Sequence, residues 1–343
     1  MTEKVLVTPA ELSAMLPAED IVLIDTRDPA TYAAGHLPGA VNIHDIFTYL
    51  ATSTPDGVAA MRDKLAASFG AAGLSGKETA VVYEQSMNSG FGQSCRGYVL
   101  LRYLGYPKVK ILHGGYAAWN AAGMPTTTEV PTPKVSSFAI DPKAASILVD
   151  LQGMKVAVAD PNVVKLDTRD VDEWIADSSS PYGKDYCPRK GRIPGAVWIE
   201  WYRMMKPTAN GPMFKSAPEI LAECASVGVT QDTPVVLYCF KGARASNTLV
   251  ALKEPASRTS ASISAPGTNG HAIRRCRSRR GFLLRPALLP SPRLEASTNR
   301  RAPGISGAPR NGDAAQNSGT GNASQEDGNV GPQSGHGRGD KRS

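Results

Sequence analysis

One short segment of the sequence combines residues that could form a reactive nucleophile. Residues 239–244 read CFKGAR; they follow the apolar run VVLY at 235–238, and a helical pattern begins after them. A sulfur atom at such a strand-to-helix turn receives loop N–H groups, the partial positive charge of a helix N-terminus, and the charges of Lys241 and Arg244. These groups favour the thiolate of Cys239, which is the nucleophilic form of cysteine. They would also hold the persulfide anion that forms when this sulfur attacks a sulfane sulfur.

The two halves of the chain repeat one pattern. Residues 21–28 (IVLIDTRD) and 163–170 (VVKLDTRD) each join an apolar strand to the same polar turn. Residues 35–41 (GHLPGAV) and 191–197 (GRIPGAV) follow, and the second half holds 14 additional residues between its two blocks. A repeat of this length indicates two copies of one folding unit.

The repeated unit is predicted to be an α/β structure. Apolar, β-branched runs alternate with helical patterns, such as residues 57–69 and 217–227, which is typical of parallel strands joined by crossover helices. Each half should therefore form a small open parallel sheet with helices on both faces, and ligands should bind at the carboxyl ends of the strands. Asp25 and Asp167 end strands, so we expect them to cap the following turns and to pair with local arginines rather than to act as catalytic acids.

The first half has no cysteine where the second half has its reactive one. Counted from the matching glycines of the repeat, Glu84 occupies the position of Cys239. Cys95 lies 11 residues beyond that point and is interpreted as a small apolar thiol. Arg96 and Arg244 lead into helical patterns with leucines at the same offsets. The second half alone is therefore predicted to carry the chemistry.

These patterns divide the chain into four parts. We predict a non-catalytic N-terminal domain at 1–125, a linker at 126–140, and a catalytic C-terminal domain at 141–254. From Pro255 onward the chain has 13 arginines and a single lysine and is rich in small polar residues, which predicts a disordered, low-complexity basic tail at 255–343. The second domain would then lack its last strand and helix. A change of reading frame near residue 254 is the interpretation that we prefer, and a natural disordered tail is the alternative.

Charge and cysteine content limit the functional classes. The net charge is +7 overall, but residues 1–254 hold 24 basic and 26 acidic side chains, so nucleic acid is an unlikely partner and only the tail could contact it. No export signal or run of 18 apolar residues is visible, and the five cysteines are an odd number without a C-x-x-C pair or zinc-type spacing. These features predict a cytoplasmic protein with free thiols and neither a metal nor a membrane partner.

The paired blocks, with a C-x-x-x-x-R loop only in the second copy, resemble the tandem-domain rhodanese family over residues 5–254. This family contains the thiosulfate and 3-mercaptopyruvate sulfurtransferases. The resemblance implies two rhodanese-like domains, an N-terminal domain without catalytic cysteine, and a sulfurtransferase that works through a persulfide on Cys239. It also implies a small anionic sulfur donor, a thiol or cyanide acceptor, and no organic cofactor.

The resemblance assigns further site residues. Lys241 matches a lysine of thiosulfate-preferring members, whereas mercaptopyruvate enzymes have a neutral Gly-Ser-Gly run there. The family takes a substrate-binding arginine from an Arg-aromatic step after the Asp block, but this chain has Glu173-Trp174. Basic residues at 189, 190 and 192 are the candidates to replace it. The expected substrate-binding residues are therefore Lys241, Gly242, Ala243, Arg244, Arg192 and Arg189.

Two other functions compete with this interpretation. Some tyrosine phosphatases share a cysteine-arginine loop, but they need five residues between the two side chains, and this chain has four. An inactive or binding-only protein is the stronger alternative, because the loss of a central strand would exceed the ~5–15 kcal/mol stability of a domain. The donor preference, the physiological acceptor and the oligomeric state stay open.

Overall fold

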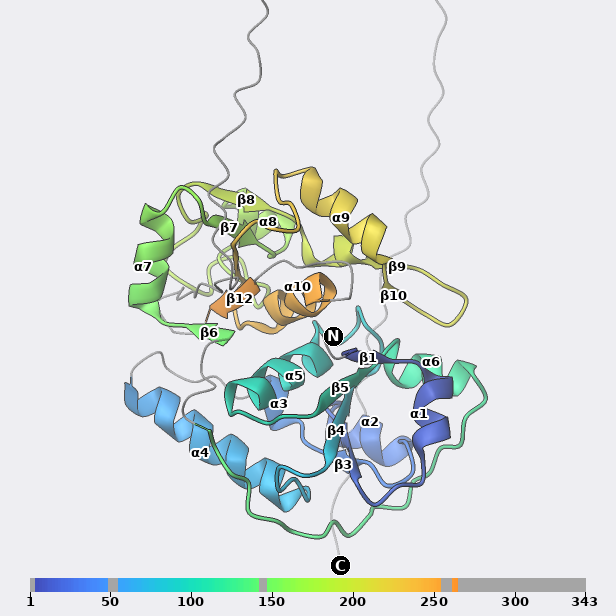
Figure 1. The fold of residues 1–343 in the computed structure, drawn as a ribbon. Coiled ribbons are helices and arrows are strands. Elements are labelled where there is room, and N and C mark those ends of the chain that lie inside the picture. The colour runs from blue at the N-terminus through green and yellow to red at the C-terminus, as the bar shows by residue number, and fades with distance from the viewer. Residues whose placement is uncertain (1–3, 49–54, 142–146, 254–260, 265–343) are drawn as a thin grey trace, which may run out of the picture. The chain divides into compact units, whose positions relative to one another are not determined.

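The computed structural model describes residues 4–48, 55–141, 147–253 and 261–264. Within these ranges the chain forms two five-stranded parallel sheets and one two-stranded antiparallel sheet (Figure 1). The large sheets have strand orders β1-β5-β4-β2-β3 and β6-β12-β11-β7-β8, which are the same order repeated. The predicted repeat of an α/β unit with parallel strands is confirmed. No helix of the described residues is long and apolar enough to cross a membrane.

The N-terminal domain alternates strands and helices. Its strands are β1 (Leu6–Val7), β2 (Ile21–Asp25), β3 (Val41–Asn42), β4 (Thr79–Tyr83) and β5 (Val109–Leu112). Its helices are α1 (Pro9–Met15), α2 (Pro29–Ala34), α3 (Asp45–Thr48), α4 (Pro55–Ala71), α5 (Gln93–Tyr103) and α6 (Gly115–Ala121).

The C-terminal domain repeats this arrangement with an added hairpin. Its strands are β6 (Leu148–Val149), β7 (Val164–Asp167), β8 (Ala196–Trp198), β9 (Met205–Lys206), β10 (Met213–Phe214), β11 (Val235–Tyr238) and β12 (Ala261–Ser264). Its helices are α7 (Leu151–Ala159), α8 (Val171–Trp174), the 3-10 helix η2 (Trp201–Met204), α9 (Ala217–Ala225) and α10 (Ala243–Lys253).

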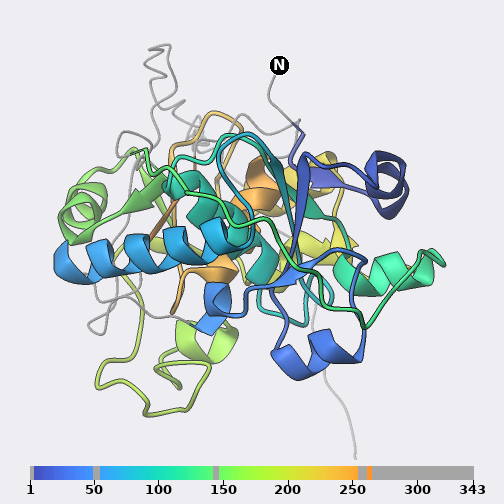
Figure 2. The same ribbon diagram turned by 90° about the horizontal axis from the view of Figure 1, so that it is seen from below.

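Helices cover both faces of the first sheet. Successive strand residues point to opposite sides and therefore pack against different helices. Val82 faces a core shared with α3, α4 and α5, whereas its neighbours Val81 and Tyr83 face a second core with Leu12 of α1 and Trp119 of α6. Figure 2 shows the long helix α4 on the side of the domain opposite to α1 and α6. In an open sheet of this kind, the loops at the carboxyl ends of the strands form the site.

Buried ion pairs fix the turn that follows β2 and the equivalent turn after β7. Asp167 accepts hydrogen bonds from the backbone N–H of Arg169 at 3.0 Å and from its guanidinium at 2.6 Å. The same guanidinium donates to the carbonyl of Gly191 at 2.8 Å, which ties the two sequence blocks together. Asp25 and Arg27 make the matching contacts in the first domain. The prediction that these acids cap turns and pair with local arginines is confirmed.

The strand predicted to be missing from the second domain is present. Ala261–Ser264 forms β12, which pairs in parallel with β11 on one side and with β6 on the other. It takes the place that β5 has in the first sheet. The expectation of a sheet without this strand was therefore wrong, because a four-residue strand was hidden in a segment whose overall composition is polar. The predicted loss of the last helix, and the rest of the predicted tail at 255–343, lie outside the described residues.

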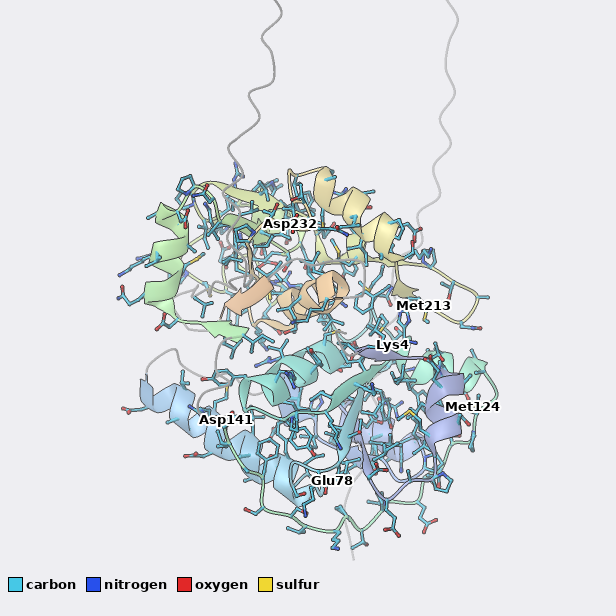
Figure 3. All side chains as sticks on the ribbon, viewed as in Figure 1. Lys4, Glu78, Met124, Asp141, Met213 and Asp232 are labelled. Atoms are coloured by element: carbon cyan, nitrogen blue, oxygen red, sulfur yellow. The ribbon has the colours of Figure 1, made fainter. Side chains whose placement is uncertain are left out.

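The two domains contact each other through a pair of helices and through a hairpin, among other contacts. Helix α5 packs against α10, and the β9-β10 hairpin reaches the turn before α6. There the backbone N–H of Phe214 donates to Nε2 of His113 at 2.9 Å, and burial lowers the pKa of His113 to about 4, which keeps the ring neutral as this acceptor role requires. The sulfur of Met213, which is labelled in Figure 3, lies 2.5 Å from where a Cβ on Gly114 would be. Only glycine fits that turn.

The position of β12 predicts the effect of a proline. Ile263→Pro should lower the midpoint of thermal unfolding by about 6 °C or more, because proline removes a ladder hydrogen bond from a central strand. Val130→Pro, in the exposed segment between the domains, is the control and should shift the midpoint by no more than about 2 °C. Differential scanning calorimetry measures both, and equal midpoints for the two variants would contradict the pairing of β12.

Candidate active site

The sulfur of Cys239 lies in the loop between β11 and α10. Its Sγ accepts hydrogen bonds from the backbone N–H groups of Gly242 at 3.1 Å and Ala245 at 3.4 Å. Gly242 has a φ of +88°, a left-handed conformation that glycine adopts without strain and that turns the loop back over the sulfur. The side chain is only 4% exposed. A negative charge on this sulfur would therefore be held by backbone amides at a helix N-terminus.

Two aromatic residues that line the Cys239 pocket, Tyr182 and Phe240, belong to a cluster of three. Tyr182, Tyr186 and Phe240 contact one another with ring centroids 5.7 to 5.8 Å apart. The ammonium group of Lys241 lies 4.0 Å from the centroid of the Tyr182 ring. Both tyrosines come from the additional residues between the two sequence blocks of the second repeat. The pocket is lined by Cys239 together with Phe91, Pro181, Tyr182, Phe240, Lys241, Ala243 and Arg244.

Arg244 lines the pocket, and its guanidinium already forms ion pairs with two carboxylates. Its Nη1 donates to a carboxylate oxygen of Glu173 at 2.5 Å and lies 3.0 Å from Asp170. Although burial alone would lower it, the pKa of Arg244 is raised by the negative charges of Cys239 and Glu173. Its Nη2 makes no hydrogen bond to the described residues. One N–H-bearing nitrogen of this arginine is thus left to donate to a ligand.

Glu173 stands where the family resemblance expects a substrate-binding arginine. Its side chain is fully buried, and burial raises its pKa while the neighbouring Arg244 opposes the shift. Asp170, Asp172 and Glu173 bring carboxylate oxygens within 4.8 Å of one another, but Arg244 already pairs with two of the three. Here the acid fixes the loop arginine instead of binding an anionic substrate, and sequence reasoning did not foresee this pair.

The basic residues proposed to replace that arginine do not line the pocket. Arg192 donates to the carbonyl of Trp174 at 3.1 Å, and its guanidinium lies 4.3 Å from the Trp174 ring centroid. Lys190 pairs with Asp185 at 2.6 Å. Arg189 is exposed and, like Arg192, is absent from the residues that line the Cys239 pocket. Of the expected substrate-binding residues, the pocket brings together Lys241, Ala243 and Arg244, with Gly242 holding the sulfur.

Two residues of the N-terminal domain belong to this region, and sequence reasoning did not assign them to it. Phe91 lines the pocket and contacts the buried Trp201, with ring centroids 6.0 Å apart. Arg96 is 4% exposed, and burial lowers its pKa to about 10, while Cys239 and Tyr182 act in the opposite direction. The repeat offered a signal for Arg96, since it matches Arg244 in the second copy.

The first domain holds a carboxylate where the second holds its sulfur. Glu84 is fully buried and accepts hydrogen bonds from the backbone N–H of Gln93 at 3.0 Å and from the hydroxyl of Ser94 at 2.7 Å. Burial raises its pKa from the ordinary 4.5 to about 7. The neighbouring Cys95 is buried, and burial raises the pKa of its thiol well above the usual value. This domain thus keeps the anion-holding loop but fills it with its own side chain.

Known proteins with similar sequences share this architecture. The family model for a rhodanese-like domain matches residues 8–122 and 151–269. A thiosulfate sulfurtransferase of Azotobacter vinelandii is 29% identical over 235 residues, which are 68% of this chain and 81% of that protein. The sulfur carrier protein TtuD of Thermus thermophilus is 28% identical over 240 residues, with 68% and 79% covered. Among solved structures, the 3-mercaptopyruvate sulfotransferase SseA of Escherichia coli has a TM-score of 0.60 at 21% identity, with 77% of this chain and 99% of that chain covered, which shows the fold.

The buried Glu84 predicts a pH-dependent stability. Because its pKa is raised in the folded chain, its contribution is present below about pH 4.5 and is lost as the pH rises to about 7, a loss on the order of 3 kcal/mol. Glu84→Gln keeps an oxygen acceptor and an N–H donor, so its gain in stability over the wild type should be small at pH 5 and larger at pH 8. Urea denaturation at both pH values measures this.

The control for this prediction is Glu129→Gln, which changes an exposed glutamate to the same amide. It should not alter the difference in the free energy of unfolding between pH 5 and pH 8. If Glu84→Gln shifted the stability equally at both pH values, the buried carboxylate would not titrate as described.

Proposed function

This chain belongs to the rhodanese-like domain family, and we propose that it is a sulfurtransferase that moves sulfane sulfur from thiosulfate or 3-mercaptopyruvate to cyanide or a thiol through a persulfide on Cys239. The observation that carries this proposal is the position of the Cys239 sulfur at the N-terminus of α10, where two backbone N–H groups donate to it. Such a loop stabilises both a thiolate and the persulfide anion that replaces it.

The proposed cycle has two displacement steps. With thiosulfate, the thiolate of Cys239 attacks the outer sulfur, a new S–S bond forms, and the old S–S bond breaks with its electron pair leaving on sulfite. In the second step the acceptor, cyanide or a thiolate, attacks the outer sulfur of the persulfide. The S–S bond breaks again, the acceptor leaves carrying the sulfur, and the thiolate of Cys239 is restored. The persulfide anion replaces the thiolate in the first step, and the thiolate replaces the persulfide anion in the second. The loop therefore holds one negative charge throughout.

Two observations favour thiosulfate as the donor. Lys241 lies in the pocket beside Tyr182, in the position where thiosulfate-preferring members have a lysine. The relative from Azotobacter vinelandii bears the name of a thiosulfate sulfurtransferase. The uncommitted Nη2 of Arg244 supports an anionic donor of either kind, since it offers a charge-assisted hydrogen bond inside the pocket.

The first domain is proposed to serve as a scaffold without sulfur chemistry. Glu84 fills its loop, and a carboxylate cannot form a persulfide. The alternative of an inactive or binding-only chain was based on the absence of the last strand of the second sheet. Because β12 occupies that position, a missing strand is no longer a reason to expect an inactive chain.

The test is the formation of thiocyanate from thiosulfate and cyanide. The wild-type chain should produce it, and Cys239→Ser should reduce the rate by at least about 10³-fold, because a serine hydroxyl cannot carry sulfane sulfur. Cys187→Ser, a partly exposed cysteine that lies outside the pocket lining, is the matched control and should retain the rate. Equal rates for wild type and Cys239→Ser would contradict the proposal, and so would activity on p-nitrophenyl phosphate in place of thiosulfate.

A further inference from the structure

Residues 90–92 form a loop of the first domain that is pressed between Glu84 and helix α10. A Cβ on Gly90 would lie 2.4 Å from Oε2 of Glu84. A Cβ on Gly92 would lie 2.8 Å from the carbonyl oxygen of Ala243, the first residue of α10. Both distances are shorter than van der Waals contact, so the loop leaves no room for a side chain at either glycine. It therefore extends from the buried carboxylate of one domain to the helix that begins at the catalytic loop of the other.

The carboxylate of Glu84 fixes the point where this loop enters α5. Its Oε2 accepts the backbone N–H of Gln93 at 3.0 Å, and its Oε1 accepts the hydroxyl of Ser94 at 2.7 Å. The backbone carbonyl of Glu84 accepts the N–H of Tyr116 at 2.8 Å, so its main chain is held as well. The side chain is fully buried, and hydrogen bonds to an ionised acceptor are stronger than those between neutral groups. Glu84 thus anchors the loop to the end of β4.

Phe91 lies between the two glycines and contacts the second domain. Its φ of 55° is uncommon for a residue with a side chain, and such a conformation persists where the surrounding structure holds it. Its ring centroid lies 6.0 Å from that of the buried Trp201. The ring also lines the pocket of Cys239, and among the described residues that line this pocket it is the one from the first domain. The anchored loop therefore supplies part of the pocket lining.

The pocket has room for only a few atoms. Its volume is about 40 Å³, whereas a cavity needs about 10–15 Å³ to hold one water molecule. Phe91 and Tyr182, from different domains, both line it with bulky aromatic rings. Because a ring occupies more space than the whole cavity, a displacement of Phe91 would change the size of molecule that can reach the sulfur.

We propose that Glu84 is a positioning residue for the Cys239 pocket: its carboxylate holds the loop 90–92 so that Phe91 narrows the pocket and restricts it to small sulfur donors and acceptors. This inference rests on the proposed function and deepens it, because it states the size class of the substrates. It also gives a role to the carboxylate that stands where the second domain has its reactive cysteine. Bulky thiols would be excluded by the ring that Glu84 indirectly holds in place.

The experiment compares a small and a bulky thiol reagent, iodoacetamide and N-phenylmaleimide, on Cys239 of the full chain. Mass spectrometry of the Cys239 peptide gives the two rates at pH 8, where Glu84 is ionised because its pKa is about 7. The readout is the ratio of the bulky to the small rate, since a change in thiolate reactivity alone acts on both reagents. Phe91→Ala should raise this ratio about tenfold, because the pocket gains the space of a ring.

Glu84→Ala should raise the same ratio by about threefold or more, because the loop loses its anchor. The double variant Glu84→Ala/Phe91→Ala should match Phe91→Ala alone, since both substitutions act through one side chain. Glu84→Gln keeps an oxygen acceptor and should restore the wild-type ratio. A double variant in which the two effects multiply would show that Glu84 does not act through Phe91 and would overturn the proposal.

Glu78→Ala is the matched control. This carboxylate, labelled in Figure 3, also accepts a backbone N–H and a serine hydroxyl, both from Ser75, at 2.7 and 2.9 Å. It belongs to the same domain but is absent from the residues that line the pocket. Its removal should leave the ratio unchanged. A rise equal to that of Glu84→Ala would mean that any loosening of the first domain opens the pocket, and the specific role of Glu84 would be lost.

The remaining outcomes separate this inference from the proposed function, because alkylation needs no sulfur donor. If neither reagent reaches Cys239 in the folded wild-type chain, the proposed function fails, since a pocket closed to both admits no donor. If the wild type reacts but Phe91→Ala or Glu84→Ala leaves the ratio unchanged, only the positioning role is overturned. Should Glu84→Ala fail to fold by circular dichroism, Ser94→Ala removes the hydroxyl contact alone and should raise the ratio in the same direction. An unchanged ratio in that variant would count against the proposal equally.

Discussion

One contact is central to the site of this protein, the approach of two backbone N–H groups to the sulfur of Cys239. Gly242 and Ala245 donate at 3.1 and 3.4 Å, at the point where β11 ends and α10 begins. Such donors are fixed by the backbone and need no reorganisation when charge develops, which is why they suit an anionic sulfur. The parallel sheet places this loop at its carboxyl edge, and the buried pair of Asp167 and Arg169 fixes the adjacent turn.

The repeat shows how one fold serves two purposes. In the first domain the equivalent loop closes around the carboxylate of Glu84, which satisfies the amides with a group of the protein itself. In the second domain the same position is left to a sulfur beside a pocket. The first domain contacts the second where α5 packs against α10, and Phe91, in the loop before α5, lines the pocket. The tandem arrangement can thus contribute a pocket residue from one domain to the site of the other without duplicating its chemistry.

Local features could be predicted from the sequence, whereas contacts between distant segments could not. The strand, turn and helix around Cys239 and the capping role of Asp167 depend on neighbouring residues, and both predictions agree with the structure. The pair between Arg244 and Glu173 joins residues 71 positions apart and depends on how α8 packs on α10. The place of Phe91 in the pocket lining depends on the contact between the two domains. Strand β12 was missed because four residues are too few to stand out from a polar, arginine-rich segment.

Mass spectrometry of the full chain after incubation with thiosulfate shows whether Cys239 carries sulfur. We predict that the peptide with Cys239 gains about 32 Da, the mass of one sulfur atom, and loses it when cyanide is added. The peptides with Cys95 and Cys224, whose thiols are buried and have raised pKa values, should not change. A Cys239 peptide that never gains this mass while the chain is folded would contradict the account.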